Sequence, residues 1–118
     1  MVRRQRMARS QMGLLQGTLD ILVLKALEDE SRHGYGVADW VHARTSGALE
    51  IEDGALYTSL HRMEKRGWLT SDWGVSENNR RAKYYGLTRS GRAKLARATD
   101  EWTRYAEAVF SVLGSRGE

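Results

Sequence analysis

Cationic side chains in one short stretch are the residues of this sequence best suited to chemistry. Residues 53–69 read DGALYTSLHRMEKRGWL, where His61, Arg62 and Lys65 stand among apolar residues. Side chains of this kind pair with phosphate oxygens and hydrogen bond to the edges of nucleic-acid bases. An apolar seam alone is enough to hold a helix in a core, so the cationic residues beside it predict a polyanionic partner.

Patterns typical of catalytic and metal-binding sites do not occur in the sequence. His33, His42 and His61 lack the spacing of metal ligands, there is no cysteine, and neither a glycine-rich phosphate loop nor a nucleophile motif is found. The HGYG segment at residues 33–36 is better explained by glycines that allow close packing at the start of a helix. We therefore expect no catalytic residue, no bound metal and no cofactor, and a protein that is not an enzyme.

Positive charge is concentrated in two segments of the chain. The 118 residues carry a formal net charge of +4, and residues 1–19 hold four arginines and no acidic residue. Residues 20–60 hold three basic and eight acidic side chains, whereas residues 61–94 hold nine basic and three acidic ones. A charged run can be an ordinary solvated surface, but segregation this strong favours a polyanion over that alternative.

Apolar spacing predicts two helices before the cationic stretch. The first runs from about residue 18 to 28, with Thr18 as its N-cap and apolar residues almost all round. The second runs from about residue 33 to 45 and ends at Ser46-Gly47. Both should be core helices, and the second is expected to turn inward Tyr35, Val37, Ala38 and Val41.

The cationic stretch itself is predicted to be a third helix with a buried and an exposed side. Leu56, Leu60 and Met63 recur at i, i+4 and i+7 and form the buried seam, and Gly67 suits the left-handed residue that ends a helix. Lys65 is expected to meet phosphate. The candidates for base edges and nearby phosphates lie on or beside the exposed flank, and they are Tyr57, Thr58, Ser59, His61 and Arg62.

A β-hairpin, or wing, is predicted after the third helix. Its strands are LTSDWGV at residues 69–75 and AKYYGL at residues 82–87, joined by the turn SENNRR. Alternate residues of the first strand should line one covered face, namely Leu69, Ser71, Trp73 and Val75. The wing cations expected to contact phosphate are Arg80, Arg81 and Lys83. Three helices followed by a two-stranded wing predict a mainly α, winged helix-turn-helix fold.

This architecture predicts double-stranded DNA as the partner. The major groove of B-DNA is about 12 Å wide and admits one helix. A helix held by one apolar seam can present its other flank to base edges, while a cationic hairpin reaches the neighbouring backbone or minor groove. We expect the third helix to discriminate between DNA sequences and the wing to contribute affinity.

The last helix is too long for one small domain to cover. From Thr88, a suitable N-cap, to about Ser115 it would span about 28 residues and thus roughly 42 Å. Part of it should pack on its own domain, but a seven-residue apolar repeat over this length favours a partner helix from a second subunit. We therefore expect a homodimer whose interface contains Leu95, Ala98, Trp102, Tyr105, Ala106, Val109, Val112 and Leu113.

The order of these motifs resembles the PadR family of bacterial transcriptional regulators. The similar segments are GTLDILVLKAL, HGYGV, DGALYTSLHRMEKRGWL and SENNRRAKYYGLTRSG, and the likeness runs from about Leu14 into the last helix. Resemblance to the short subfamily implies one C-terminal dimerisation helix, binding of operator DNA as a homodimer and, usually, repression. The sequence departs from the family at Thr58, where relatives often carry Pro, and Thr restores the backbone donor that Pro lacks.

Two alternative functions stay open for this architecture. Some relatives bind planar aromatic compounds between paired C-terminal helices, and the resemblance places Trp102 at such an effector site, although we favour a role for Trp102 in the dimer core alone. A sensor that mainly binds a small molecule is therefore one alternative. The other is a winged-helix protein-interaction module, which would not need Arg80, Arg81 and Lys83 beside a cationic helix.

Length and composition predict the domain organisation. A chain of 118 residues forms one modest core. We divide it into a basic N-terminal segment (1–13), the winged helix-turn-helix DNA-binding domain (14–87) and the C-terminal dimerisation helix (88–118). The longest apolar run, Ile21 to Leu24, cannot span a bilayer, and no signal-like apolar core follows the first residues. We expect a cytoplasmic, nucleoid-associated protein without a membrane partner.

Overall fold

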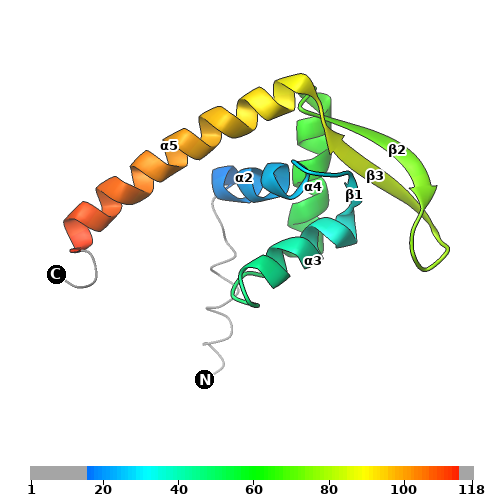
Figure 1. Ribbon diagram of the computed structural model, residues 1–118, viewed down its shortest axis with the longest axis horizontal. Coiled ribbons are helices and arrows are strands. Elements are labelled where there is room, and N and C mark those ends of the chain that lie inside the picture. Colours follow the sequence, from blue (N-terminus) through cyan, green and yellow to red (C-terminus); the bar gives the residue numbers. More distant parts are fainter. Residues whose placement is uncertain (1–15, 115–118) are drawn as a thin grey trace.

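Four helices and three strands make up the part of the chain that the computed structural model describes, residues 16–114 (Figure 1). In chain order they are α2 (Gln16–Ala26), β1 (Arg32–His33), α3 (Gly34–Arg44), α4 (Asp53–Lys65), β2 (Leu69–Val75), β3 (Arg81–Leu87) and α5 (Arg89–Leu113). This arrangement confirms the predicted winged helix-turn-helix with a long last helix. The basic segment 1–13 lies outside the described residues, and no helix within them is long and apolar enough to cross a membrane.

Helices α2, α3 and α4 enclose one hydrophobic core. The first two predicted helices are present, with each end within two residues of its expected position. Thr18 lies inside α2 rather than at its N-cap, and Tyr35 is exposed although it was expected to face inward. Tyr35 lies about 200° around α3 from the buried Val37, so the two side chains cannot share a face. The fully buried side chains include Val23, Leu24, Leu27, Val37, Val41, Leu56, Leu60, Met63 and Tyr85.

The sheet has one strand more than the predicted two-stranded wing. Its order is β1-β3-β2, all antiparallel, and the additional strand β1 pairs Arg32 with Tyr85 and His33 with Tyr84. A strand of two residues is too short to show an alternating pattern in the sequence. β1 ties the root of the wing to the start of α3.

The wing consists of β2, the turn at residues 76–80 and β3, and its tip extends beyond the helical core (Figure 1). The strand bounds of β2 match the prediction, but only part of its expected covered face is covered. Leu69 is buried and Ser71 is half-buried, whereas Trp73 and Val75 expose 59% and 65% of their surfaces. The hairpin leaves the core after Ser71, so no element covers this face of its outer half.

Helix α5 begins beside the wing and points away from it (Figure 1). Its N-cap is Thr88, as predicted, whose hydroxyl oxygen accepts a hydrogen bond of 3.0 Å from the backbone N–H of Gly91. Leu95 and Ala98 are buried against the rest of the chain. The C-terminal half of α5 continues past α2 and ends at Gly114, which has a φ of 86°.

Candidate nucleic-acid interface

Helix α4 separates a buried seam from an exposed polar flank. Leu56, Leu60 and Met63 have no exposed surface, which confirms the predicted seam. Gly67 has a φ of 82°, the left-handed conformation expected at the end of this helix. The exposed members of the predicted flank are Thr58, His61 and Lys65.

Two residues predicted for this flank form hydrogen bonds to α2 instead. The Ser59 hydroxyl is fully buried and donates a 2.7 Å hydrogen bond to Asp20, so its expected place on the exposed flank is wrong. The Arg62 guanidinium donates to both carboxylate oxygens of Asp20, at 2.7 and 3.0 Å. This hydrogen bonding to Asp20 raises the pKa of Arg62. Neither side chain is then free to contact a base edge.

This polar cluster is an interaction that the sequence pattern could not predict. Asp20 is only 8% exposed and lies 42 positions before Arg62 along the chain. A buried carboxylate is costly unless it is paired and hydrogen bonded, and here three donors from α4 satisfy it. The cluster therefore fixes how α4 is rotated against α2, and with it the direction of the exposed flank.

Tyr57 is half-buried and packs on the glycine of the HGYG segment. A Cβ atom built on Gly34 would lie 2.2 Å from the Tyr57 hydroxyl and 2.6 Å from the ring carbon that carries it. This contact confirms the packing interpretation of HGYG. Burial, together with the nearby Tyr35 and Asp53, raises the pKa of Tyr57. The centre of the Tyr57 ring lies 6.4 Å from that of His61, an exposed residue of the flank.

The three predicted wing cations do not share one environment. Arg80 is exposed in the turn, and the Arg81 guanidinium carbon lies 4.4 Å from the centre of the Trp73 ring. Lys83 is half-buried, with its Nζ 3.9 Å from a carboxylate oxygen of Glu64 on α4. Arg80 and Arg81 are therefore the wing cations available near the tip, while Lys83 serves the contact between the wing and α4.

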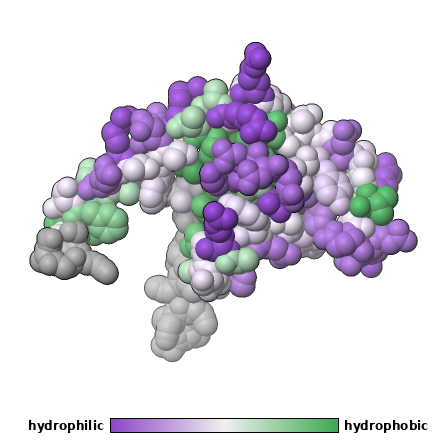
Figure 2. Space-filling view, in the orientation of Figure 1, coloured by the Kyte–Doolittle hydropathy of each residue, from purple (hydrophilic) through white to green (hydrophobic). Residues whose placement is uncertain are grey.

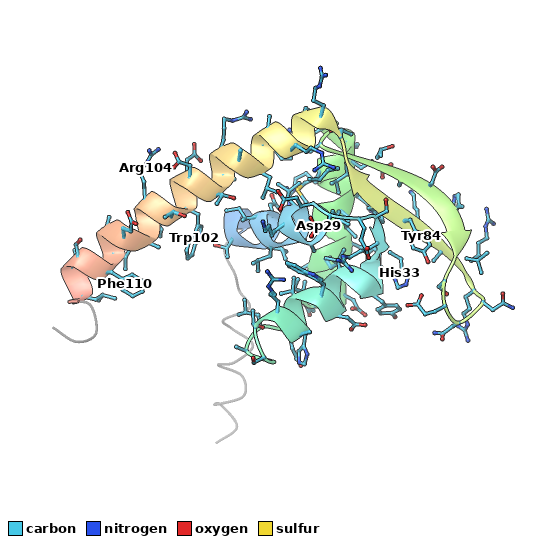
Figure 3. All side chains as sticks on the ribbon, in the orientation of Figure 1. Asp29, His33, Tyr84, Trp102, Arg104 and Phe110 are labelled. Carbon is cyan, nitrogen blue, oxygen red and sulfur yellow. The ribbon has the colours of Figure 1, made fainter. Side chains whose placement is uncertain are left out.

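A second set of contacts braces the opposite face of the wing. His33 Nδ1 accepts a hydrogen bond of 3.1 Å from the backbone N–H of Gly36, so neutral His33 carries its proton on Nε2, which lies 3.5 Å from Glu77 Oε1 in the turn. The Glu77 backbone first, and His33 second, lower the pKa of the Glu77 carboxyl. The His33 ring also meets the Tyr84 ring edge to face at 5.3 Å (Figure 3). Sequence reasoning missed this brace because its partners come from distant segments.

An open cavity lies where α2, α4 and α5 meet. Its volume is about 520 Å³, and its lining includes Asp20, Arg62, Trp68, Lys94, Trp102 and Tyr105. The indole N–H of Trp102 donates a 3.1 Å hydrogen bond to the Thr18 hydroxyl. The cavity is thus lined both by the last helix and by Asp20 and Arg62, the polar cluster that orients α4. Among the described residues, no group of three or more acidic, His or Cys side chains is arranged to hold a metal ion.

The predicted dimerisation residues fall into two groups in the structure. Leu95 and Ala98 are buried by their own domain, so they were wrongly placed in a subunit interface. Ala106 is half-buried, and Phe110, which lies outside the seven-residue repeat, joins the exposed residues on the side of Trp102 (Figure 3). We call the exposed residues the distal stripe: Trp102, Tyr105, Val109, Phe110, Val112 and Leu113. Part of this stripe is visible as an apolar area at the end of α5 (Figure 2).

A comparison with known families adds to this geometry. The profile of the transcriptional regulator PadR-like family matches residues 23–97, which is more than half of the chain. The chain belongs to the PadR-like family. The matched region begins in α2 and ends in α5, so this PadR-like protein carries the winged helix-turn-helix of the family.

Solved PadR structures share the fold of this PadR-like chain. A PadR family transcription regulator from hypervirulent Clostridium difficile R20291 is 31% identical, with a TM-score of 0.66 over 80% of this chain and 96% of that one. A second, from Eggerthella lenta DSM 2243, is 26% identical, with a TM-score of 0.73 over 98% of this chain and all of that one. An uncharacterized protein X from Lysinibacillus sphaericus is 28% identical over 96 residues, 81% of this chain and 88% of that protein. Membership in a family of transcriptional regulators implies DNA binding.

Proposed function

We propose that this PadR-like protein is a repressor that binds an inverted-repeat operator as a homodimer. The observation that carries the proposal is the exposed polar flank of α4 beside a protruding hairpin with two arginines near its tip. A single helix fits the major groove, and a cationic hairpin can follow the adjacent backbone. A transcriptional regulator with these two features needs no catalytic site, and we infer a non-enzymatic role in the cytoplasm, at the nucleoid.

We infer that α4 is the recognition helix and that its outward residues read the operator. Thr58 and His61 are exposed on it and are our candidates for base edges, with the half-buried Tyr57 beside His61. Lys65 lies one to two turns further along and is our candidate for a phosphate contact. Ser59 and Arg62 are assigned no DNA contact. Their hydrogen bonds to Asp20 orient the helix.

The wing is inferred to supply affinity. Arg80 and Arg81 expose long cationic side chains near the tip, where they can reach the backbone or the minor groove next to the groove occupied by α4. Lys83 is not in this group, since its ammonium group faces Glu64. Loss of the exposed arginines is therefore expected to weaken binding to any duplex, whereas loss of α4 side chains weakens binding to the operator alone.

The distal stripe supports dimerisation through α5. Its six large apolar side chains lie on the C-terminal half of α5, and an exposed patch of this kind marks an interface. We infer that a second copy of the chain covers the stripe. Two-fold symmetry then requires an inverted repeat, with half-site centres about 10 base pairs apart or a multiple of that spacing.

A small aromatic effector is a second proposal, favoured by the cavity beside Trp102. A volume of about 520 Å³ lies within the range of roughly 300 to 1,000 Å³ that is usual for small-molecule sites. The cavity is lined both by Trp102 and by Arg62, so a ligand there would touch the residues that orient α4. An effector of this kind would release operator DNA by favouring a different position of α4.

Selection from a library of random duplexes tests the proposed function. The protein should enrich one inverted-repeat sequence, and a Thr58→Ala/His61→Ala double variant should enrich it less or enrich a different one. A Ser111→Ala variant is a control, because Ser111 is exposed on α5 and is placed in none of the proposed contacts. Failure of the wild type to enrich any sequence would contradict a repressor that recognises an operator.

A further inference from the structure

An exposed aromatic residue near the tip of the wing is not used by the contacts proposed above. Trp73 exposes 59% of its surface and Val75 exposes 65%, although both stand within a regular strand. Both lie on the same face of β2, since alternate residues of a strand share a face. Two large apolar side chains exposed side by side on a protruding hairpin are available to contact a partner.

The indole of Trp73 holds a cation on this face. Val75 pairs with Arg81 across the hairpin, which makes Arg81 the diagonal neighbour of Trp73. The Arg81 guanidinium carbon lies 4.4 Å from the centre of the indole ring, within the range of a cation–π interaction. This interaction favours positions of the Arg81 guanidinium over the indole. Such a pair suits a partner with an anionic group for Arg81 and an apolar surface for Trp73.

The opposite face of the hairpin makes contacts within the chain. The ring of Tyr84 covers Gly74, where an added Cβ would lie 3.0 Å from the ring, and the Tyr84 hydroxyl donates a 3.2 Å hydrogen bond to the backbone oxygen of Val75. His33 packs against the same ring and also approaches Glu77 in the turn. These contacts brace the hairpin on the side away from Trp73, so the face of Trp73 and Arg81 is both rigidly supported and free.

This free face adjoins the recognition helix. Nearer its root, the face carries Ser71, whose hydroxyl donates a 2.6 Å hydrogen bond to Glu64 of α4, and Lys83, which lies beside the same carboxylate. The register places Trp73 opposite Lys83, so Trp73 continues this surface outward from α4. A duplex with α4 in its major groove would bring its next minor groove or its backbone against this face.

We propose that Trp73 and Arg81 together form a minor-groove reader that responds to the width of the groove. Arg81 enters the groove, while Trp73 positions the guanidinium and packs its indole on the sugars of the groove wall. Runs of A·T pairs have a narrow minor groove whose negative potential attracts arginine, so A·T-rich flanks bind more tightly than G·C-rich ones. This inference rests on the proposed operator binding, which it extends to base pairs flanking the α4 contacts.

Binding to one selected operator with two flanks tests this reader. The operator core is kept constant, its flanks are A-tracts or G·C pairs, and affinities are measured for the wild type and for Trp73→Ala, Trp73→Phe, Arg81→Ala and the Trp73→Ala/Arg81→Ala double variant. The wild type should prefer the A-tract flank by about fivefold, because its narrow minor groove attracts Arg81 more strongly. Trp73→Ala and Arg81→Ala should each reduce the preference to below about twofold, and Trp73→Phe should keep most of it.

Three features of the design keep the result interpretable. The indole is largely exposed, so the circular dichroism and melting of Trp73→Ala should match the wild type. Arg104→Ala is the charge-matched control, because Arg104 lies on the outer side of α5 and points away from the body (Figure 3). In the double variant, the loss of affinity should be smaller than the sum of the two single losses, because Trp73 acts by positioning Arg81.

Several outcomes would overturn the proposal. Unchanged affinity and flank preference in Trp73→Ala, or losses that add independently, would show that Trp73 does not position Arg81. A wild type that binds the operator specifically but treats both flanks alike would refute the reader while the proposed function stands. A wild type that selects no DNA sequence would refute the proposed function and the reader with it.

Discussion

The carboxylate of Asp20 sets the orientation of α4 through three short hydrogen bonds. Its donors are the hydroxyl of Ser59 and both terminal nitrogens of Arg62. These bonds are charge-assisted and largely shielded from water, so they are stronger than a surface ion pair. A side chain far from the exposed flank therefore decides which α4 residues face outward.

Asp20→Asn should destabilise the protein substantially. The substitution keeps an oxygen for Ser59 but removes the negative charge that compensates the half-buried Arg62, and breaking such a pair costs about 3 kcal/mol. Asp100→Asn is the matched control, because the Asp100–Arg104 pair is exposed on α5 and should contribute below about 0.5 kcal/mol. Urea unfolding at one protein concentration measures both. Equal small losses in the two variants would show that the Asp20 cluster is no stronger than a surface pair.

The close contact between Gly34 and Tyr57 leads to a second prediction. Gly34→Ala places a methyl group 2.2 Å from the Tyr57 hydroxyl, so the ring must move and the free energy of unfolding should fall by about 1 to 3 kcal/mol. Gly54→Ala is the control within a helix, since nothing lies within 4 Å of its added Cβ. Alanine there should be neutral or should stabilise by up to about 1 kcal/mol. A Gly34→Ala protein as stable as Gly54→Ala would contradict the contact.

At the scale of elements, local signals in the sequence predicted most of the fold. The seam of α4, the N-cap Thr88 and the left-handed Gly67 each depend on residues within a few positions, and each is present as expected. The strand bounds of β2 were also predicted, because a strand between turn residues is visible in the pattern. These features position the candidate interface.

Features that depend on distant segments could not be predicted. Ser59 satisfies the pattern of an exposed helix face, and only the approach of Asp20 buries it. A seven-residue repeat cannot tell whether its neighbour belongs to the same chain, so Leu95 was assigned to a partner although its own domain covers it. Phe110 falls outside that repeat and was missed. The two-residue strand β1 is defined by its pairing with β3 alone.

The division of labour between α4 and the wing gives the third prediction. His61→Ala should weaken binding to the operator by about 1 to 3 kcal/mol and leave random DNA unaffected, because a base contact is lost. Arg80→Ala should weaken both and flatten the salt dependence by about one unit, because a phosphate contact is lost. Titrations of each variant with operator and random duplexes measure these effects. The assignment of roles fails if His61→Ala weakens both duplexes equally.

The whole molecule has an extended shape because α5 leaves the body on the side away from the wing (Figure 1). Its distal stripe is exposed in a single chain, while the wing extends from the other end of the molecule (Figure 1). A dimer formed through α5 would join two DNA-binding units by a rigid helical connection. The spacing of the two half-sites would then follow from how the two copies of α5 pack.

Charged residues in the distal stripe should dissociate the dimer without unfolding each chain. Val109→Glu/Phe110→Glu places two carboxylates where the partner would exclude water, which costs several kcal/mol in an interface. Ser111→Glu is the control, because Ser111 lies about 180° around the helix from Trp102. Sedimentation at micromolar concentration should show a dimer for the wild type and Ser111→Glu, and a monomer for the double variant. A wild-type monomer would contradict α5-mediated dimerisation.

The central claim, sequence-specific DNA binding, is tested most directly by one salt series. Wild-type protein is titrated with the selected operator and with a scrambled duplex of the same composition and length at increasing salt. Both affinities should fall with salt because cations of the wing contact phosphates, and the operator should stay at least about a thousandfold tighter because base contacts survive screening. Equal affinity for the two duplexes at every salt concentration would contradict the claim and leave only a non-specific polyanion binder.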